Sequence, residues 1–469
     1  MLKHGQTCPN IARTELIVGV GLLLATATSC ASARHTNPPP ALAASAVPAP
    51  PPGRADIFVP EVPAPDPSTS SEVSLARLLA YADQHAPAIR VARARSRRGD
   101  AEVEAASLIL QSNPEIEAGV GRRAIGPATF FEAEASIQQR IEIAGERGLR
   151  VETAERTREV ALSEQDEARW LVHAAVHTLF LDSLIARERV GAAERVVRFS
   201  EELQHVAQRR VDAGDDAPLA MLVVRADLAQ ARERLIAAQL EEKAALLVLA
   251  EAVGWPADRP LTPKGTLPPV RAARPVSDLV RLAAQRHPAL RTQALAVAEA
   301  ESRTRLEARE AWPEPTVGFA YAREGGESPA PDIGLFTVGL PLPFWNRNQG
   351  ERARASVALD TARAEQAALG VRLQNRIARA AAAVNAAAQR IKIYGADVIP
   401  AVERNLELIR RAYDLGEIDI HDVSQTRERV LDAQSRVIDA RSEYSRALAD
   451  LEAQVGTELD DVAVQETTP

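Results

Sequence analysis

The chain has 469 residues, a formal net charge of −8 and only 4% aromatic residues, while alanine, leucine, arginine and glutamate recur throughout. Such a composition favours long helices over a β-rich core. The acidic net charge and the lack of any lysine- or arginine-rich block argue against nucleic acid as a partner. A soluble coiled-coil protein fits these features equally well, so the segments along the chain must decide.

Residues 1–29 have the layout of a secretory signal peptide. Lys3 and Arg13 precede an apolar run from Leu16 to Ala25, and small residues follow the run. This order of a basic, an apolar and a small-residue region is typical of export signals. The run is too short to span a bilayer as a permanent helix, so we expect it to be removed.

Cys30 follows Ala27-Thr28-Ser29, which resembles a bacterial lipobox with alanine in place of the usual leucine at position 27. We therefore predict that Cys30 is lipidated and becomes the first residue of the mature protein; the alternative is ordinary cleavage near Ala31, which leaves a free thiol. Alanine at position 31 favours sorting to the outer membrane. The other cysteine, Cys8, lies in the signal peptide, so no internal disulfide is expected.

Residues 30–72 are dominated by proline, alanine and serine and are typical of an extended tether. The remaining chain is an internal duplication: a first repeat at 73–256, a second at 275–456, and a tail at 457–469. A shift of 201 places Pro87-Ala88-Ile89-Arg90 on Pro288-Ala289-Leu290-Arg291 and Pro114 on Pro315, and a shift of 202 places Gly214 on Gly416 and Val253-Gly254 on Val455-Gly456. Agreement over nearly the whole body indicates two copies of one structural unit.

Each repeat begins with a predicted helical stretch, 74–110 or 277–311, which ends before Pro114 or Pro315. Two segments follow in which apolar side chains recur at every second residue, a period that predicts strands facing two different environments. The apolar rows are Ile116, Ala118 and Val120 with Ala133, Ala135 and Ile137 in the first repeat, and Val317, Phe319 and Tyr321 with Phe336, Val338 and Leu340 in the second.

Long helices are predicted after the strands, at 145–213 and 350–415, with Pro400 as their only proline. At 1.5 Å per residue each reaches about 100 Å, and Gly214 and Gly416 suit the turns at their ends. The returning helices carry heptads, which predict a coiled-coil seam. These rows are Val423, Val430, Val437, Tyr444 and Leu451 in the second repeat and Leu228, Leu235 and Leu249 in the first. A simple antiparallel coiled coil is the alternative, but it needs no strands.

This order of elements, present twice, resembles the TolC family of outer-membrane efflux proteins. Within that family the chain is most similar to CzcC-like members, which serve heavy-metal exporters of the resistance–nodulation–division type. The resemblance spans roughly residues 73–456. It is most specific at 338–350, Val-Gly-Leu-Pro-Leu-Pro-Phe-Trp-Asn-Arg-Asn-Gln-Gly, with further matching stretches at 139–147, 412–419 and 430–434.

The resemblance implies a mainly α fold with a β-barrel, in which long coiled-coil helices of a homotrimer form an α-barrel. Three chains with four strands each would supply a barrel of twelve strands. The apolar rows would face outer-membrane lipid, while the acidic residues on the opposite strand face would line the lumen: Glu115, Glu117, Glu132 and Glu134. The protein would then sit in the outer membrane through a lipid anchor, with a long periplasmic extension.

The implied function is a passive exit duct for divalent heavy-metal cations. Energy would come from an inner-membrane resistance–nodulation–division pump, joined to the duct by a periplasmic adaptor protein. The alternatives are a duct for drugs or other small organic molecules, a structural coiled-coil lipoprotein that spans the envelope and, more weakly, the adaptor itself. The adaptor has one hairpin and no duplicated strand pair, which counts against the last of these.

The resemblance also places a periplasmic gate near the second turn. Asp422 matches an aspartate that forms a constriction ring in family members, and Asp419 is close enough to add charge; a second aspartate of the family is replaced by Gln425. The turns expected to meet the adaptor contain Gly214, Asp215, Gly416 and Glu417. The alternative is that these acids are ordinary solvated turn and helix-start residues.

Catalytic chemistry is not indicated. His173 and His177 have the i, i+4 spacing of a helical metal grip, and His421 stands beside Asp422. No third ligand lies near the first pair in sequence, so a packed or lumen-lining pair is the better interpretation. With no phosphate loop or nucleophile elbow, we expect no enzyme activity, no metal site and no cofactor.

Overall fold

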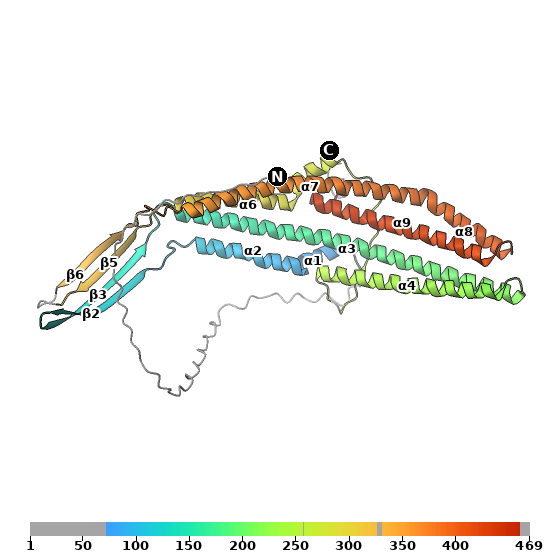
Figure 1. The fold of residues 1–469 in the computed structure, drawn as a ribbon, viewed down its shortest axis with the longest axis horizontal. Coiled ribbons are helices and arrows are strands. Elements are labelled where there is room, and N and C mark those ends of the chain that lie inside the picture. Colours follow the sequence, from blue (N-terminus) through green and yellow to red (C-terminus); the bar gives the residue numbers. More distant parts are fainter. Residues whose placement is uncertain (1–71, 257, 326–330, 460–469) are drawn as a thin grey trace, which may run out of the picture. The chain divides into compact units, whose positions relative to one another are not determined.

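The computed structural model describes residues 72–256, 258–325 and 331–459. The predicted signal peptide, Cys30, almost all of the linker and residues 460–469 of the tail lie outside the described residues. The described chain contains the same series of elements twice, as the colours of Figure 1 show. Among these residues, no helix combines the length and the apolar character that a membrane crossing needs.

The first series runs from two short helices through a strand pair into two long helices. Its elements are α1 (Leu75–His85), α2 (Pro87–Ala106), β2 (Glu115–Ile125), β3 (Ala128–Arg140), α3 (Glu146–Ala213) and α4 (Pro218–Val253). The second series repeats this order with α5 (Val276–Arg286), α6 (Pro288–Arg309), β5 (Thr316–Arg323), β6 (Asp332–Gly339), α7 (Gln349–Ile393), α8 (Ile399–Asp414) and α9 (Ile420–Val455). A short parallel pair, β1 (Glu72–Val73) with β4 (Thr262–Pro263), ties the start of the body to the inter-repeat segment; Glu72, assigned above to the linker, therefore belongs to the fold.

The first helical stretch predicted in each repeat is divided into two helices. The helices break at Ala86 and His287, which have ψ angles of 127° and 119° and precede the prolines that begin α2 and α6. The proline ring disfavours helical geometry at the residue before it, which explains both breaks. The second long helix is also interrupted, by a π-helical segment at Tyr394–Val398 just before Pro400. A proline that cannot donate to the preceding turn accounts for this irregularity.

The four longer strands form one antiparallel sheet in the order β2-β3-β5-β6. Its register places Ile116 opposite Ile137, Ile137 opposite Phe319, and Phe319 opposite Phe336. Since residues directly opposite each other share a face, these apolar positions form one row across the sheet, as the alternation predicted. Leu340, expected to end the last row, lies just beyond β6.

The helices next to the sheet follow the order of the strands, because α2 packs on α3, α3 on α6, and α6 on α7. The returning helix α4 packs on α3, and the returning helix α9 packs on α7; α9 also packs on α3. Most heptad positions are buried, including Val423, Val430, Tyr444 and Leu451, whereas Val437 and Leu235 are only partly covered. Each fully buried aliphatic side chain contributes about 1.5–3 kcal/mol, so this seam holds the hairpins together.

The long helices begin after residues with left-handed backbones, Gly145 (φ 80°) and Asn348 (φ 56°). These positions differ by 203, whereas the strands before them agree at 201. The connection from β6 to α7 is therefore two residues longer than its counterpart. This longer connection contains Trp345, which is 88% exposed.

Glycines at the ends of α3 and α9 allow a direct stability test. A Cβ atom at Gly456 (φ 86°) would lie 2.6 Å from the Cα of His287, whereas at Gly214 (φ 84°) nothing lies within 4 Å. Gly214→Ala should therefore cost only the left-handed strain of about 1–2 kcal/mol, and Gly456→Ala should cost clearly more. Thermal unfolding of the two purified variants measures the difference; equal losses would contradict the steric argument.

Candidate functional site

The two hairpin turns lie next to each other, one helix length from the strands. Gly214 ends α3 and Gly416 follows α8, both with left-handed φ angles, of 84° and 77°. Backbone hydrogen bonds close the turns, from Asp215 N to Arg210 O (2.8 Å) and from Glu417 N to Ala412 O (2.9 Å). A Cβ atom on Gly416 would lie 3.4 Å from a guanidinium nitrogen of Arg210, so the first hairpin reaches the turn of the second.

Three side chains connect the hairpins at this point. Arg210 Nε lies 2.9 Å from Asp216 Oδ2, and the hydroxyl of Tyr413 donates to the same oxygen at 2.8 Å. Arg210 Nη1 also donates to the carbonyl oxygen of Tyr413 at 2.6 Å, and its guanidinium lies 4.8 Å from the centre of that ring. Tyr413 is fully buried. We call this set of Arg210, Asp216 and Tyr413 the tip link.

The tip link changes the acidity of its members. Burial on its own raises the pKa of Asp216, but the hydrogen bonds from Arg210 and Tyr413 and the charge of Arg210 outweigh it, so the pKa lies below its ordinary value. Burial, and then the hydrogen bond to Asp216, raises the pKa of Tyr413. The carboxylate therefore stays charged and the phenol stays protonated over the whole neutral range, which keeps the link intact.

The predicted gate residues Asp419 and Asp422 lie at the start of α9. Asp419 caps α9, because its Oδ1 accepts from the backbone N–H groups of His421 (2.8 Å) and Asp422 (3.1 Å). This local role explains Asp419 as a helix-start residue. Asp422 is exposed in the first turn of α9, and Asp215 and Glu417 are exposed in their turns.

The sequence prediction missed Arg210 and Tyr413. Both lie within four residues of a turn glycine, and tyrosine is scarce, with only five in the chain. A tyrosine three residues before a turn glycine was the available signal. Its partner could not be inferred, because 203 residues separate Arg210 from Tyr413.

The sheet has two unlike faces. Large apolar side chains stand exposed on one of them, including Ile116 (72%), Val120 (78%) and Phe336 (75%). The four predicted glutamates share the opposite face, since Glu117 pairs with Ser136 while Glu134 and Glu132 stand opposite Gly119 and Gly121. Only the first repeat supplies this acidity: the same face of the second carries Ala320 and Leu335.

Arg123 reduces the acidity at the far end of the first strand pair. Its Nε lies 2.6 Å from Glu132, and its Nη1 lies 4.0 Å from Glu324. Glu115, Glu117 and Glu134, which are all exposed, therefore carry most of the charge that this face presents.

The two histidines of α3 contact carboxylates from the end of the chain. His173 Nε2 lies 2.7 Å from Glu458, and His177 Nδ1 lies 3.2 Å from the buried Glu452. Trp170 stacks on the His173 ring with centroids 5.1 Å apart. The described residues contain no group of three or more metal-type side chains suited to an ion. The pair therefore joins α3 to the end of α9.

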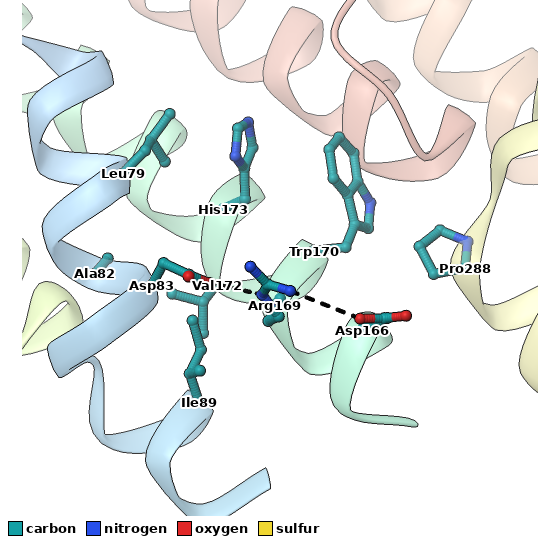
Figure 2. A pocket seen from close by; sticks show the side chains of 10 residues that line it. All are labelled: Leu79, Ala82, Asp83, Ile89, Asp166, Arg169, Trp170, Val172, His173 and Pro288. Carbon is teal, nitrogen blue, oxygen red and sulfur yellow. Dashed lines mark hydrogen bonds and ion pairs between the residues drawn. The ribbon is translucent and has the colours of Figure 1, made fainter. Parts of the chain in front are cut away.

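A cavity of about 340 Å³ lies beside these residues, between α1, α3 and the start of α6. Figure 2 shows Arg169 in its middle, between Asp83 and Asp166. The arginine Nε lies 2.6 Å from Asp83, and Nη1 lies 3.8 Å from Asp166. Because these carboxylates already balance its charge, Arg169 supports local packing of the short helices and offers no catalytic group.

An antiparallel sheet with an exposed apolar face, continued by helices of about 100 Å, is the build of a membrane channel with a long soluble extension. A family model described as "Outer membrane efflux protein" matches residues 78–255 and 279–457. These segments make up well over half of the sequence, and the chain therefore belongs to the outer membrane efflux protein family. It is an outer-membrane efflux channel protein.

Known relatives agree with this assignment. The chain is 25% identical to the cobalt-zinc-cadmium resistance protein CzcC of Cupriavidus metallidurans over 304 residues, which cover 65% of this chain and 70% of that protein. The fold is similar to that of CusC (TM-score 0.67, 14% identity), with 82% of this chain and 92% of that chain covered. VceC of Vibrio cholerae is similar as well (TM-score 0.65, 17% identity), with coverage of 82% and 96%.

Proposed function

We propose that the protein is the trimeric exit duct of a three-part efflux system that exports divalent heavy-metal cations. A proton-driven inner-membrane pump would supply the energy, and a periplasmic adaptor would join the pump to this duct. The four-stranded sheet carries the proposal, because it exposes an apolar face on one side and carboxylates on the other. A purely structural coiled-coil lipoprotein has no use for such a sheet.

The two free edges of the sheet support the proposed trimer. Strands β2 and β6 each have one neighbour, so both leave backbone N–H and C=O groups unpaired along their outer sides. Such groups cost several kcal/mol each in hydrocarbon, and only a closed barrel satisfies all of them. Three copies with four strands each would close a barrel of twelve strands.

The direct experiment is reconstitution of the full-length protein in planar lipid bilayers, together with light scattering in detergent. We expect a trimer that produces stepwise ionic currents. A monomeric protein that produces no current would reject the duct. Growth of a deletion strain on cobalt, zinc or cadmium, compared with growth on organic toxic compounds, separates metal export from the export of organic molecules.

The N-terminus belongs to the same proposal. Cleavage after residue 29 and acylation of Cys30 would anchor the body to the outer membrane through the proline-rich segment. Metabolic labelling with radioactive palmitate should mark the wild type and leave Cys30→Ala unlabelled. Equal labelling of both proteins would place the lipid elsewhere.

The acidic strand face predicts cation preference. Three copies of Glu117 and Glu134 would form a dense ring of negative charge in the lumen. The double variant Glu117→Gln/Glu134→Gln should lower the ratio of cation to anion permeability severalfold, as measured from reversal potentials in a salt gradient. Glu233→Gln, a change at an exposed position of α4, is the matched control and should leave the ratio unchanged. An unaltered ratio in the double variant would mean that these residues face away from the lumen.

Opening would take place at the hairpin tips. An adaptor bound to the turns at Gly214, Asp215, Gly416 and Glu417 would pull α8 and α9 away from α3 and α4 and break the tip link. Three copies of Asp422 near this point would form a negative neck, with Asp419 holding the start of α9 in place. Asp422→Ala should therefore reduce cation preference or change basal conductance.

A further inference from the structure

The sheet and the helices that adjoin it share the same free edges. Strands β2 and β6 are outermost in the sheet, and α2 and α7, which adjoin them in the chain, are outermost in the row α2-α3-α6-α7. The register also aligns the strand ends. Glu115 lies opposite Gln138, Arg140 opposite Thr316, and Thr316 opposite Gly339. The first residue of β2 and the last residue of β6 are therefore at the same end of the sheet.

At this end each edge continues into an exposed apolar connection. The β2 connection, residues 107–114, contains Leu108, Ile109 and Leu110, and the Ile109 side chain is 78% exposed. The β6 connection, residues 340–348, exposes four large apolar side chains: Leu340, Leu342, Phe344 and Trp345. Two such patches beside unpaired strand edges indicate surfaces that another molecule covers.

The β6 connection borders a groove of about 980 Å³. Its lining combines apolar side chains with polar ones: Trp312, Pro313, Leu340, Leu342 and Trp345, and Arg140, Glu310, Glu314, Asn346 and Asn348. The groove thus offers both apolar contacts and charged groups to a partner surface.

We propose that the β2 connection of a second copy occupies this groove, with its Ile109 packed against Leu342 and Trp345. The inference rests on the proposed trimer, in which β6 of one copy pairs with β2 of the next. In the register we propose, Glu115 of the second copy lies beside Gly339, which places the residues just before Glu115 beside those just after Gly339. The unpaired edge of β6 needs a partner strand, which β2 of the second copy would supply. Because the β2 connection directly precedes β2 in the chain, it would lie next to the groove.

Cysteine cross-linking tests the contact, because Cys8 and Cys30 are the only native cysteines. The double variant Ile109→Cys/Leu342→Cys, oxidised in the assembled full-length protein, should give covalent dimers and trimers on a non-reducing gel. A bond within one copy is excluded, since three strand spacings of about 4.8 Å separate the two edges. Ile109→Cys/Ile236→Cys is the control: Ile236 is 67% exposed on α4, and this pair should give no ladder.

The outcomes separate this inference from the proposed function. If light scattering and conductance show a trimeric channel but neither Ile109→Cys/Leu342→Cys nor the second pair Leu110→Cys/Leu340→Cys forms a ladder, the contact is wrong and the duct stands. If no trimer forms in the wild type, both fail. Quenching by brominated phospholipid, in a variant that keeps only Trp345, should be weak. Strong quenching would make lipid the occupant and overturn the proposal.

Discussion

Asp216→Asn should raise the fraction of time that the reconstituted channel is open by about tenfold or more. The change removes the negative charge of the carboxylate that accepts the hydrogen bond from the Tyr413 hydroxyl. The same carboxylate forms the ion pair that holds Arg210 against the second hairpin. A hydrogen bond to a charged group contributes about 1.5–3 kcal/mol, and 1.4 kcal/mol corresponds to a factor of ten in an equilibrium. Three copies carry the link, so its loss acts on every hairpin pair of the trimer. Single-channel recording without adaptor measures the effect.

The matched control is Asp212→Asn. Asp212 is exposed at the end of the same helix and accepts a hydrogen bond only from Gln208 within α3 in the described contacts. The Asp212→Asn substitution therefore removes one negative charge near the tip without changing a contact to the second hairpin. Similar open fractions for Asp212→Asn and Asp216→Asn would show that general tip charge, and not the link, holds the channel closed.

The same link predicts the pH dependence of opening. The pKa of Asp216 in the link lies below its ordinary value of 3.8, so the stabilisation is present at neutral pH and is lost as the pH falls through the lowered pKa. The open fraction of the wild type should stay constant from about pH 8 to 5 and rise only below about pH 4. Asp216→Asn should show no such rise. A transition near pH 6 to 7 in the wild type would show that a group other than Asp216 controls opening.

The parts of the fold that depend on local periodicity could be predicted from the sequence. The row of Ile116, Ile137, Phe319 and Phe336 follows from apolar residues at every second position, because a strand turns successive side chains to opposite faces. The buried heptad positions of α9 follow for the same kind of reason. The breaks before Pro87 and Pro288 were missed although the rule for proline is local, since helical patterning continues on both sides of each break.

Contacts between distant residues could not be predicted in this way. The tip link joins α3 to α8, and its pairing depends on how two long hairpins are aligned along their length. A heptad pattern is unchanged by a shift of seven residues, so it does not determine which turn of one hairpin meets which turn of the other. Turn glycines located the tip correctly, whereas the residues that connect the two tips required the three-dimensional structure.

Arg427→Met should destabilise the helical body by about 1–3 kcal/mol, because it leaves the partly buried Asp227 without its cation while Ser424 still donates to it. Arg427 is 3% exposed, and its Nη2 lies 3.0 Å from Asp227 on α4, while Ser424 also donates to that carboxylate at 2.7 Å. Its Nη1 reaches Ser200 on α3 at 3.3 Å. The arginine thus fixes the second hairpin against both helices of the first. An apolar seam alone would permit the two hairpins to shift against each other by one heptad.

The double variant Arg427→Met/Asp227→Leu provides the decisive comparison. Replacing both partners removes the uncompensated charge, so most of the lost thermal stability should return, as measured by the apparent melting temperature of the detergent-solubilised protein. Arg411→Met is the matched control, because Arg411 is exposed and pairs with Glu407 on its own helix; such a pair contributes only about 0.3–0.5 kcal/mol. The ion pair between Arg427 and Asp227 could also set how the two hairpins are aligned along their length. In that case the double variant should be stable but lose the tip link, and its open fraction should approach that of Asp216→Asn. A double variant that is stable and closed would show that the coiled-coil seam determines the register by itself.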